Sequence, residues 1–178
     1  MTGAKMNKAD FGILKHENAF DLIGKEWMLV TAGSMEKFNT MTASWGGIGW
    51  LWNKPVAFVF IRPERYTYEF TEREDRMTLS FLGEAGRETL KFCGSNSGRN
   101  TDKVAATGLT PCELDSGAVA FEQARLVLDC RKLFKVPMQE ADFLDKEVLS
   151  KWYNANPGGS LHDVYIVEIE SIYSTDAD

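Results

Sequence analysis

The stretch "FNTMTASWGGIGWLWNKP", residues 38–55, runs from alternating small polar and apolar residues into three glycines, three tryptophans and a proline. A core strand would favour β-branched residues such as Val and Ile. An ordinary surface loop would not expose Trp45, Trp50 and Trp52. So much aromatic surface beside glycine backbone predicts contact with a planar group.

Short runs before and after this stretch are rich in β-branched and aromatic residues, and turn residues separate them, as expected for strands. The runs span residues 27–33, 38–44, 56–62, 76–82, 121–138 and 162–174. In the last run, Tyr165, Val167 and Ile169 alternate with residues of the opposite face. Six or more strands place a sheet at the centre of the fold.

Amphipathic stretches between these runs predict helices at residues 18–25, 66–74, 86–93, 100–107 and 140–154. The strands of the first half follow one another at short spacing, without the regular strand–helix alternation of a parallel doubly wound sheet. The fold is therefore expected to be mainly β, an antiparallel β-barrel with a few helices. With no linker-like tract, residues 1–178 are expected to form a single domain.

Charge and hydropathy argue against two classes of partner. A net charge of −6 argues against nucleic acid, whose affinity comes mainly from Lys and Arg that neutralise phosphates. No run approaches the roughly 18–20 apolar residues that span a bilayer, and the N-terminal residues lack the apolar core of a signal peptide. We therefore expect a cytoplasmic protein that binds neither nucleic acid nor membranes.

Residues that usually carry metal or covalent chemistry are sparse. Cys93, Cys112 and Cys130 are widely spaced and form no C-x-x-C pair, so we expect buried thiols. His16 and His162 lie in no H-x-x-x-H or H-E-x-x-H pattern. Because no nucleophile elbow or triad order is visible either, the sequence predicts neither a metal site nor catalytic side chains of its own.

The segment "RPERYT", residues 62–67, has the features of an anion site. Pro63 suits the first turn of a helix, and the backbone N–H groups of that turn have no partner within the helix. Arg62 or Arg65 would donate bidentate hydrogen bonds to phosphate oxygens, and the Thr67 hydroxyl would add a further donor. The alternative is a solvated arginine pair beside neighbouring glutamates.

A second candidate is the loop "GSNSGRNTDK", residues 94–103, which enters a helix that Asn100 or Thr101 would cap. The loop matches neither the nucleotide-hydrolase nor the dinucleotide-binding glycine pattern. Lys103 would supply positive charge to a bound ring, or would otherwise be a solvated lysine. Together with the aromatic stretch and the anion site, this loop points to a phosphorylated planar cofactor as the source of the chemistry.

Three blocks carry a family resemblance: "NTMTASWGGIGWLWNKPVAFVFIRPERYTYEF" (39–70), "CGSNSGRNTDK" (93–103) and "GLTP" (108–111). From about Phe20 to Tyr173, the sequence resembles the flavin reductase-like FMN-binding proteins, most closely their flavoredoxin branch. The resemblance implies a split β-barrel of antiparallel Greek-key type, usually a homodimer with one FMN per subunit near the interface. Such proteins pass electrons through FMN, and some accept hydride from NAD(P)H.

The resemblance also implies roles for individual residues. Those that would line the flavin are Asn39, Thr42, Ala43, Ser44 and Trp45. Those that would hold its phosphate and ribityl end, or close over it from the second loop, are Arg62, Tyr66, Thr67, Asn100 and Lys103. A cation at Lys103 near the N1–C2=O side of the ring would favour the anionic reduced flavin. Family members often add a histidine and a C-terminal aromatic residue, for which His162 and Tyr173 are the candidates.

Two functions follow from these features. The first is an FMN-dependent oxidoreductase, reduced by NAD(P)H as a transient electron donor or by another protein. The alternative is a non-catalytic FMN-binding electron carrier that works with a redox partner protein. A barrel for another planar ligand would leave the phosphate loop unexplained. We also expect a homodimer, because Trp50 and Trp52 in a glycine-rich loop would expose much aromatic area on a lone subunit.

Overall fold

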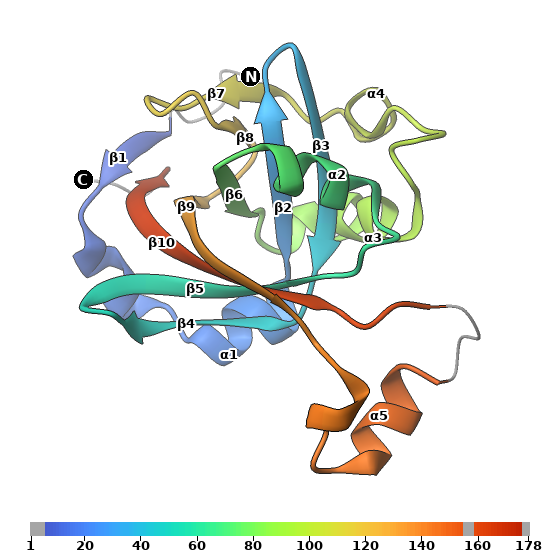
Figure 1. Cartoon of the computed structure of the whole chain (residues 1–178). Coiled ribbons are helices and arrows are strands. Elements are labelled where there is room, and N and C mark those ends of the chain that lie inside the picture. The colour runs from blue at the N-terminus through green and yellow to red at the C-terminus, as the bar shows by residue number, and fades with distance from the viewer. Residues whose placement is uncertain (1–5, 155–158, 176–178) are drawn as a thin grey trace.

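The structure, a computed structural model, describes residues 6–154 and 159–175. Its centre is an antiparallel sheet in the order β3-β2-β6-β9-β10-β5-β4, with β1 paired to β10 (Figure 1). The strands are β1 Asn7–Ala9, β2 Met28–Ser34, β3 Lys37–Ala43, β4 Gly46–Leu51, β5 Lys54–Ile61, β6 Arg76–Phe81, β9 Leu126–Pro137 and β10 Asp163–Ser174. A separate hairpin contains β7 Pro111–Glu113 and β8 Val119–Phe121.

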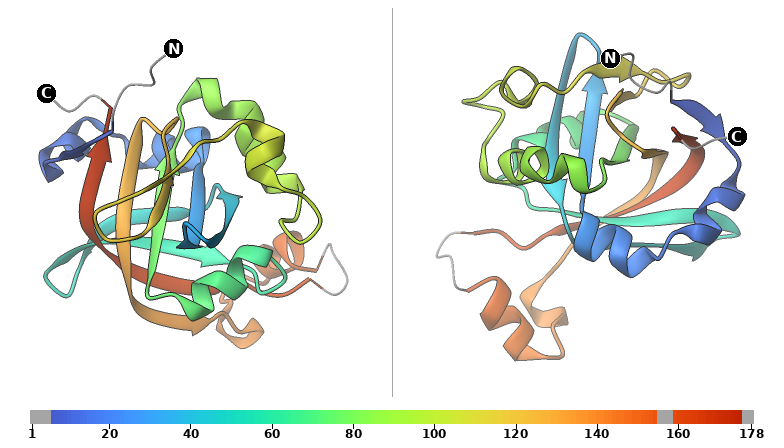
Figure 2. Two further views of the ribbon diagram at one scale, coloured as in Figure 1. Left: turned by 90° about the horizontal axis from the view of Figure 1, so that it is seen from above. Right: turned by 180° about the vertical axis from the view of Figure 1, so that it is seen from behind.

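Helices lie on both sides of the sheet and in one outlying segment. They are α1 Ala19–Asp21, α2 Tyr66–Arg73, α3 Arg87–Ser95, α4 Lys103–Thr107 and α5 Lys146–Trp152. Short 3-10 turns lie at Phe11–His16, Glu84–Gly86 and Glu140–Asp142, and a π-helical turn lies at Leu22–Glu26. The segment between β9 and β10, which contains α5, projects away from the sheet (Figures 1 and 2).

The alternation of side chains along β2 explains why a helix covers each face of the sheet there. Met28 and Val30 pack in one core cluster together with Phe70 of α2. Leu29, on the opposite face, packs in a second cluster with Leu90 of α3. Because β3 pairs with β2 along its whole length, β3 is also held between α2 and α3.

The prediction of a mainly β, antiparallel fold is confirmed, but a closed barrel is not shown. Among the residues that the structure describes, β3 and β4 end the hydrogen-bonded path and do not pair with each other. These two edge strands follow one another directly in the chain and are joined by Ser44 and Trp45. The sheet is therefore open beside the aromatic stretch of the sequence.

The expectation of a glycine-rich loop around Trp50 and Trp52 is wrong. Residues 46–51 form β4, which pairs with β5 and turns through Trp52 and Asn53. Both turn residues have positive φ, 51° and 57°, as a two-residue type I′ hairpin turn requires. The glycines hid this strand, because glycine is unfavourable in strand interiors. Trp50 and Trp52 are nevertheless exposed, as expected, at 68% and 54%.

Side-chain caps move the starts of two predicted helices. α4 begins at Lys103 because Asp102, not Asn100 or Thr101, caps it by accepting a hydrogen bond from the backbone three residues later. The last predicted helix shortens to α5, which Asp145 caps. The long run predicted before it as one strand divides into β8 and β9.

The thiols are placed largely as expected. Cys93 and Cys130 are fully buried, whereas Cys112 is only half-buried. In residues 6–154 and 159–175, no three His, Cys, Asp or Glu side chains are grouped to hold a metal ion. No helix within the same ranges combines the length and apolar character needed to cross a membrane.

Candidate functional site

Four cavities lie around the outer edge of β3 and the start of α2. The inner cavity, about 200 Å³, is lined by residues 41–45, Phe60, Arg62, Arg65 and His162. The middle cavity, about 230 Å³, is lined by Asn39, Met41, residues 64–67, residues 94–98 and Lys103. The side groove, about 460 Å³, is lined by Trp27, Thr42, Ser44, Arg65, Leu90, Lys91, Gly94 and Ser95. The outer cleft, about 610 Å³, is lined by residues 36–40, Tyr66, Phe70, residues 98–104 and Pro111.

β3 supplies the site with a free backbone edge. In the described sheet it pairs only with β2, so the backbone groups along its other side have no strand partner. The Thr40 carbonyl finds a partner in Lys103, whose Nζ donates to it at 2.8 Å. Backbone donors and acceptors left on such an edge can bind the polar rim of a planar ligand.

All ten residues that the sequence assigns to the cofactor line these cavities. The inner cavity contains Thr42, Ala43, Ser44, Trp45 and Arg62. The middle cavity contains Asn39, Tyr66, Thr67 and Lys103. Asn100 lines only the outer cleft. The structure thus gathers the ten residues in one continuous region, and their roles toward a cofactor stay predictions.

Asn39 and Thr67 connect β3 to α2 inside the middle cavity. Asn39 Nδ2 donates to Thr67 Oγ1 at 2.7 Å, and both side chains are buried. Gly98 of the following loop approaches so closely that a Cβ there would lie 2.0 Å from Asn39 Oδ1. Only glycine fits at this position, which lets the loop pack directly against the strand.

Arg65 lies where the inner cavity, the middle cavity and the side groove meet. It is the N-cap residue of α2, so the unpaired N–H groups of the first helical turn lie beside it. Its Nη2 is buried, and no described residue accepts a hydrogen bond from it. Burial lowers the pKa of the Arg65 guanidinium. A buried cationic donor without an acceptor marks a place for an anion.

Arg62 is placed differently from Arg65. Its Nη2 donates to the Trp152 carbonyl at 3.0 Å, and its Cζ lies 5.0 Å from the centre of the Tyr153 ring. Arg62 is therefore bound to the segment that contains α5, and it does not line the middle cavity with Thr67. The alternative of a solvated arginine pair is wrong for Arg65, which is desolvated. Arg62 does pair with a neighbouring glutamate, Glu64, at 3.9 Å.

Aromatic rings close the end of the inner cavity. Trp45 lies edge-on to Trp152 and also contacts His162, with ring centroids 5.3 Å apart in each pair. His162 Nδ1 lies 2.8 Å from the Tyr153 hydroxyl. Burial lowers the pKa of His162 from 6.5 to about 4, so the imidazole is neutral at neutral pH. This end of the cavity therefore combines aromatic rings with the charged side chain of Arg62, which pairs with Glu64 at 3.9 Å.

His162 and Tyr173, the candidates for the additional histidine and aromatic residue, lie in different parts of the structure. His162 lines the inner cavity. Tyr173 instead packs in the second core cluster with Leu29 and Phe121, and it lines none of the four cavities. Phe60 was not singled out from the sequence, although strand alternation in β5 predicts that it faces away from the buried Val59.

Lys103 is buried at the junction of the middle cavity and the outer cleft. Only 5% of it is exposed, and its Nζ donates to the carbonyls of Thr40 and Cys93 at 2.8 and 2.9 Å. Burial, opposed by Cys93 and reinforced by the Arg65 charge, lowers the pKa of Lys103 from 10.5 to about 8. The alternative of a solvated lysine is therefore wrong.

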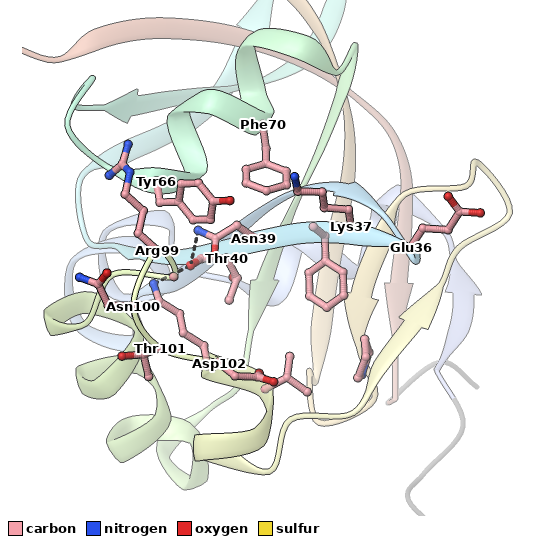
Figure 3. A pocket seen from close by; sticks show the side chains of 15 residues that line it. Glu36, Lys37, Asn39, Thr40, Tyr66, Phe70, Arg99, Asn100, Thr101 and Asp102 are labelled. Atoms are coloured by element: carbon pink, nitrogen blue, oxygen red, sulfur yellow. Dashed lines mark hydrogen bonds between the residues drawn. The ribbon is translucent and has the colours of Figure 1, made fainter.

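The outer cleft opens between α2 and the loop that precedes α4 (Figure 3). Tyr66 and Phe70 of α2 border one side, and Asn100 lies across from them. Arg99 lies over the Tyr66 ring, with 5.0 Å between Cζ and the ring centroid. Its Nη2 also donates to Glu69 Oε1 at 2.6 Å, so the loop is attached to α2 by a charged and an aromatic contact.

The sequence and the fold both match known proteins. The model of the flavin reductase like domain matches residues 20–178. Among curated proteins, none matches this chain.

Similar solved structures include proteins that bind FMN. An FMN-binding protein from Thermus thermophilus, with bound 1-cyclohex-2-enone, has 21% identity and a TM-score of 0.64 over 84% of this chain and 70% of its own. Flavoredoxin from Methanosarcina acetivorans has 20% identity and a TM-score of 0.63 over 84% and 68%. An FMN-binding domain of a flavin reductases-like enzyme from Shewanella baltica OS155 has 16% identity and a TM-score of 0.68 over 98% and 80%. At these identities the likeness shows a shared fold.

Replacing Lys103 by Met should change how stability depends on pH. Between pH 8 and 10.5 the unfolded chain keeps a proton on Lys103 that the folded protein has lost. The free energy of unfolding therefore increases as the pH rises through this window. Across this window the free energy of unfolding of the parent should increase by on the order of 3 kcal/mol more than that of Lys103→Met. Urea titrations at several pH values measure the difference.

The control for this measurement is Lys25→Met, which removes an exposed lysine. Its stability difference from the parent should stay constant across the same pH range. Burial raises the pKa of the nearby Cys93 thiol, and the Lys103 charge opposes this rise; the thiol is present in every variant. A constant difference for Lys103→Met as well would show that its ammonium is solvated.

Proposed function

The chain belongs to the flavin reductase-like domain family, and from this premise we propose that it is an FMN-binding oxidoreductase that passes electrons through bound FMN. The observation that carries the proposal is the buried Nη2 of Arg65, which has no acceptor among the described residues, on a side chain that lines three of the cavities. A phosphate is the acceptor that such a donor fits. When bound, FMN would supply a ring that takes up and releases electrons.

The middle cavity suits the phosphate. Arg65 supplies a cation, and the first turn of α2 supplies free backbone N–H groups. Thr67 Oγ1 accepts a hydrogen bond from Asn39, which leaves the Thr67 hydroxyl hydrogen free to donate to an anion. Ser97 adds a hydroxyl group from the loop that follows α3. Arg62, which the resemblance assigned to the phosphate, would instead lie at the ring end.

The inner cavity suits the ring. The free edge of β3 from Thr42 to Ser44 offers backbone donors and acceptors to its polar side. Trp45 and Phe60 offer apolar surface, and the neutral imidazole of His162 lies at the end of the cavity. Lys103, charged below about pH 8, lies close enough to the middle cavity to favour negative charge there.

The proposal also includes a more specific description of the fold than an open antiparallel sheet. We infer an antiparallel split barrel of Greek-key type, because the open sheet leaves its two edge strands on either side of the Ser44–Trp45 connection. Likeness to a flavoredoxin in fold supports a place near the flavoredoxin branch. We also propose that the protein is cytoplasmic.

Two roles remain for the bound flavin. In the first, NAD(P)H acts as a transient donor and the protein is an enzyme. In the second, the protein is a non-catalytic FMN-binding carrier that exchanges electrons with a redox partner protein. The half-open inner cavity, where the side groove reaches Thr42 and Ser44, favours the first role because a second small molecule can reach the ring from there.

We also propose a homodimer. Trp50 and Trp52 lie exposed on the β4–β5 hairpin, and the ring of Trp52 contacts Phe134 of β9, which is itself exposed. An exposed aromatic surface of this kind is typical of subunit contacts. The inner cavity lies at the other end of β4, beside Trp45, so this contact would leave the cavity accessible.

Light scattering should give a mass near twice the 20.0 kDa of one chain at micromolar concentration. Trp50→Glu should shift the mass toward that of a single chain, because a charge in an apolar contact is left unpaired. Met35→Glu, which changes an exposed residue in the β2–β3 turn, is the control and should leave the mass unchanged. A parent mass of one chain with FMN bound would contradict the dimer.

Arg65→Met should weaken FMN binding by roughly 10- to 100-fold, because each charge-assisted hydrogen bond contributes about 1.5–3 kcal/mol. Flavin fluorescence quenching or calorimetry measures the dissociation constant. Arg73→Met, at the exposed far end of the same helix, should bind FMN as the parent does. Equal affinities for the parent and Arg65→Met, or no saturable binding of FMN by the parent, would contradict the proposed site.

Anaerobic mixing of the FMN-loaded protein with NADH or NADPH tests the catalytic role. An oxidoreductase should show bleaching of the flavin absorbance at a rate that saturates with the nucleotide concentration. A carrier should stay oxidised with both nucleotides and bleach only with a chemical reductant such as dithionite. That second outcome would replace the enzyme by the carrier.

A further inference from the structure

Trp27, which lies between the π-helical turn and β2, has a backbone conformation that residues with side chains rarely adopt. Its φ is 71° and its ψ is 169°. This region of backbone conformation is accessible almost only to glycine, so any other residue in it is strained. Trp52 and Asn53 also have positive φ, but their hairpin turn requires it. A glycine at position 27 would continue the chain without strain, and yet the sequence has a tryptophan there.

Three contacts hold the side chain of Trp27 in place. Arg87 Cζ lies over the ring, 4.4 Å from its centre. The indole N–H donates to the Gly24 carbonyl at 3.3 Å, and the side chain packs against the second core cluster. Trp27 is nevertheless only partly buried, and it lines the side groove. A strained residue that is held at the wall of a cavity indicates that its side chain has a function there.

The polar groups of the side groove complement a ligand that accepts hydrogen bonds. The hydroxyl hydrogens of Thr42 and Ser95 are already donated to main-chain carbonyls of α3, at 2.6 and 2.9 Å. The charged side chains among the described lining residues are Arg65 and Lys91, both cations. Lys91 binds the exposed Glu88 with one of its three N–H donors. An indole wall and two cations suit a planar ring that carries a negative charge.

The side groove also reaches the cavity that suits the flavin ring. The two cavities share Thr42, Ser44 and Arg65. A ring compound in the side groove would therefore lie beside the edge of β3 to which the proposed function assigns the flavin ring. This is the place from which a substrate would exchange electrons with the cofactor.

We propose that Trp27 is a specificity-determining residue, whose indole holds a planar aromatic anion in the side groove while Lys91 supplies the counter-charge. The ligand class is a ring compound that bears a carboxylate or a similar oxyanion. Its role as a substrate rests on the proposed function, because the flavin ring must lie beside it. The strained backbone is retained for the position that it gives the indole, at the expense of stability.

The experiment measures the binding of three probes to the full chain by calorimetry, with and without saturating FMN. The first probe, 2-naphthoate, is planar and anionic. Its saturated analogue, decahydro-2-naphthoate, is anionic but not planar, and 2-naphthamide is planar but neutral. The parent should bind 2-naphthoate roughly tenfold more tightly than either of the other two probes.

Two variants remove the ring, Trp27→Ala and Trp27→Gly. Both should bind 2-naphthoate roughly tenfold more weakly than the parent and should no longer prefer it to the saturated analogue. Trp27→Phe keeps an aromatic ring and should keep that preference. Lys91→Met should lose the preference for 2-naphthoate over 2-naphthamide. Asn53→Gly is the control, because it places glycine at an exposed position of positive φ outside the four cavities, and it should bind as the parent does.

Thermal unfolding separates the strain from the loss of the ring. Trp27→Gly should unfold at a higher temperature than Trp27→Ala, because alanine retains a side chain in a conformation that only glycine adopts freely. The opposite order would show that the backbone at Trp27 is unstrained and would overturn the inference.

The binding data overturn the proposal if the parent binds none of the probes, or if Trp27→Ala binds 2-naphthoate as the parent does. They also overturn it if saturating FMN abolishes the binding of 2-naphthoate, because the probe would then occupy the flavin cavities. A parent that binds no FMN would contradict the proposed function instead. The titrations without FMN then still decide whether the side groove binds a planar anion.

Discussion

The unpaired edge of β3 is the constraint on which the rest of this structure depends. Backbone groups on such an edge must find partners or stay in water. Lys103 satisfies the carbonyl of Thr40, and Asn39 reaches across to Thr67 at the start of α2. The loop before α4 then packs against the strand where Gly98 allows it. What remains of the edge, near Ser44, faces the inner cavity.

Lys103, which is buried, and Arg65, which is partly buried, lie near this edge, and neither forms an ion pair with a carboxylate of the described residues. Burial disfavours the charged forms of Arg65 and Lys103, and the charge on Arg65 further lowers the pKa of Lys103. Desolvated charges of like sign destabilise a protein that holds no ligand. An anion bound between them relieves both effects. Binding a phosphate and stabilising the fold are therefore linked through the same two side chains.

The sequence was sufficient for those features that follow from local patterns. Alternation in β10 put Tyr165 on one face with Val167 and Ile169, and the structure buries that face. The three quoted blocks contain all ten residues predicted for the cofactor, and each of these lines a cavity. β4 was missed because its glycines weaken the strand signal and its turn uses Trp52 in a conformation that side chains rarely adopt. The choice between Arg62 and Arg65 depended on α5, which binds Arg62 from a distant part of the chain.

The segment between β9 and β10 leaves and returns at the same point of the sheet. Asp163 pairs with Pro137, and the Met138 N–H donates to the His162 carbonyl at 3.0 Å, which closes the base of the segment. Changes of length or sequence beyond that base leave the strand register untouched. Yet Trp152 from this segment packs against Trp45 at the inner cavity. Evolution can therefore reshape the cavity wall within a family while the sheet that carries the candidate site keeps its geometry.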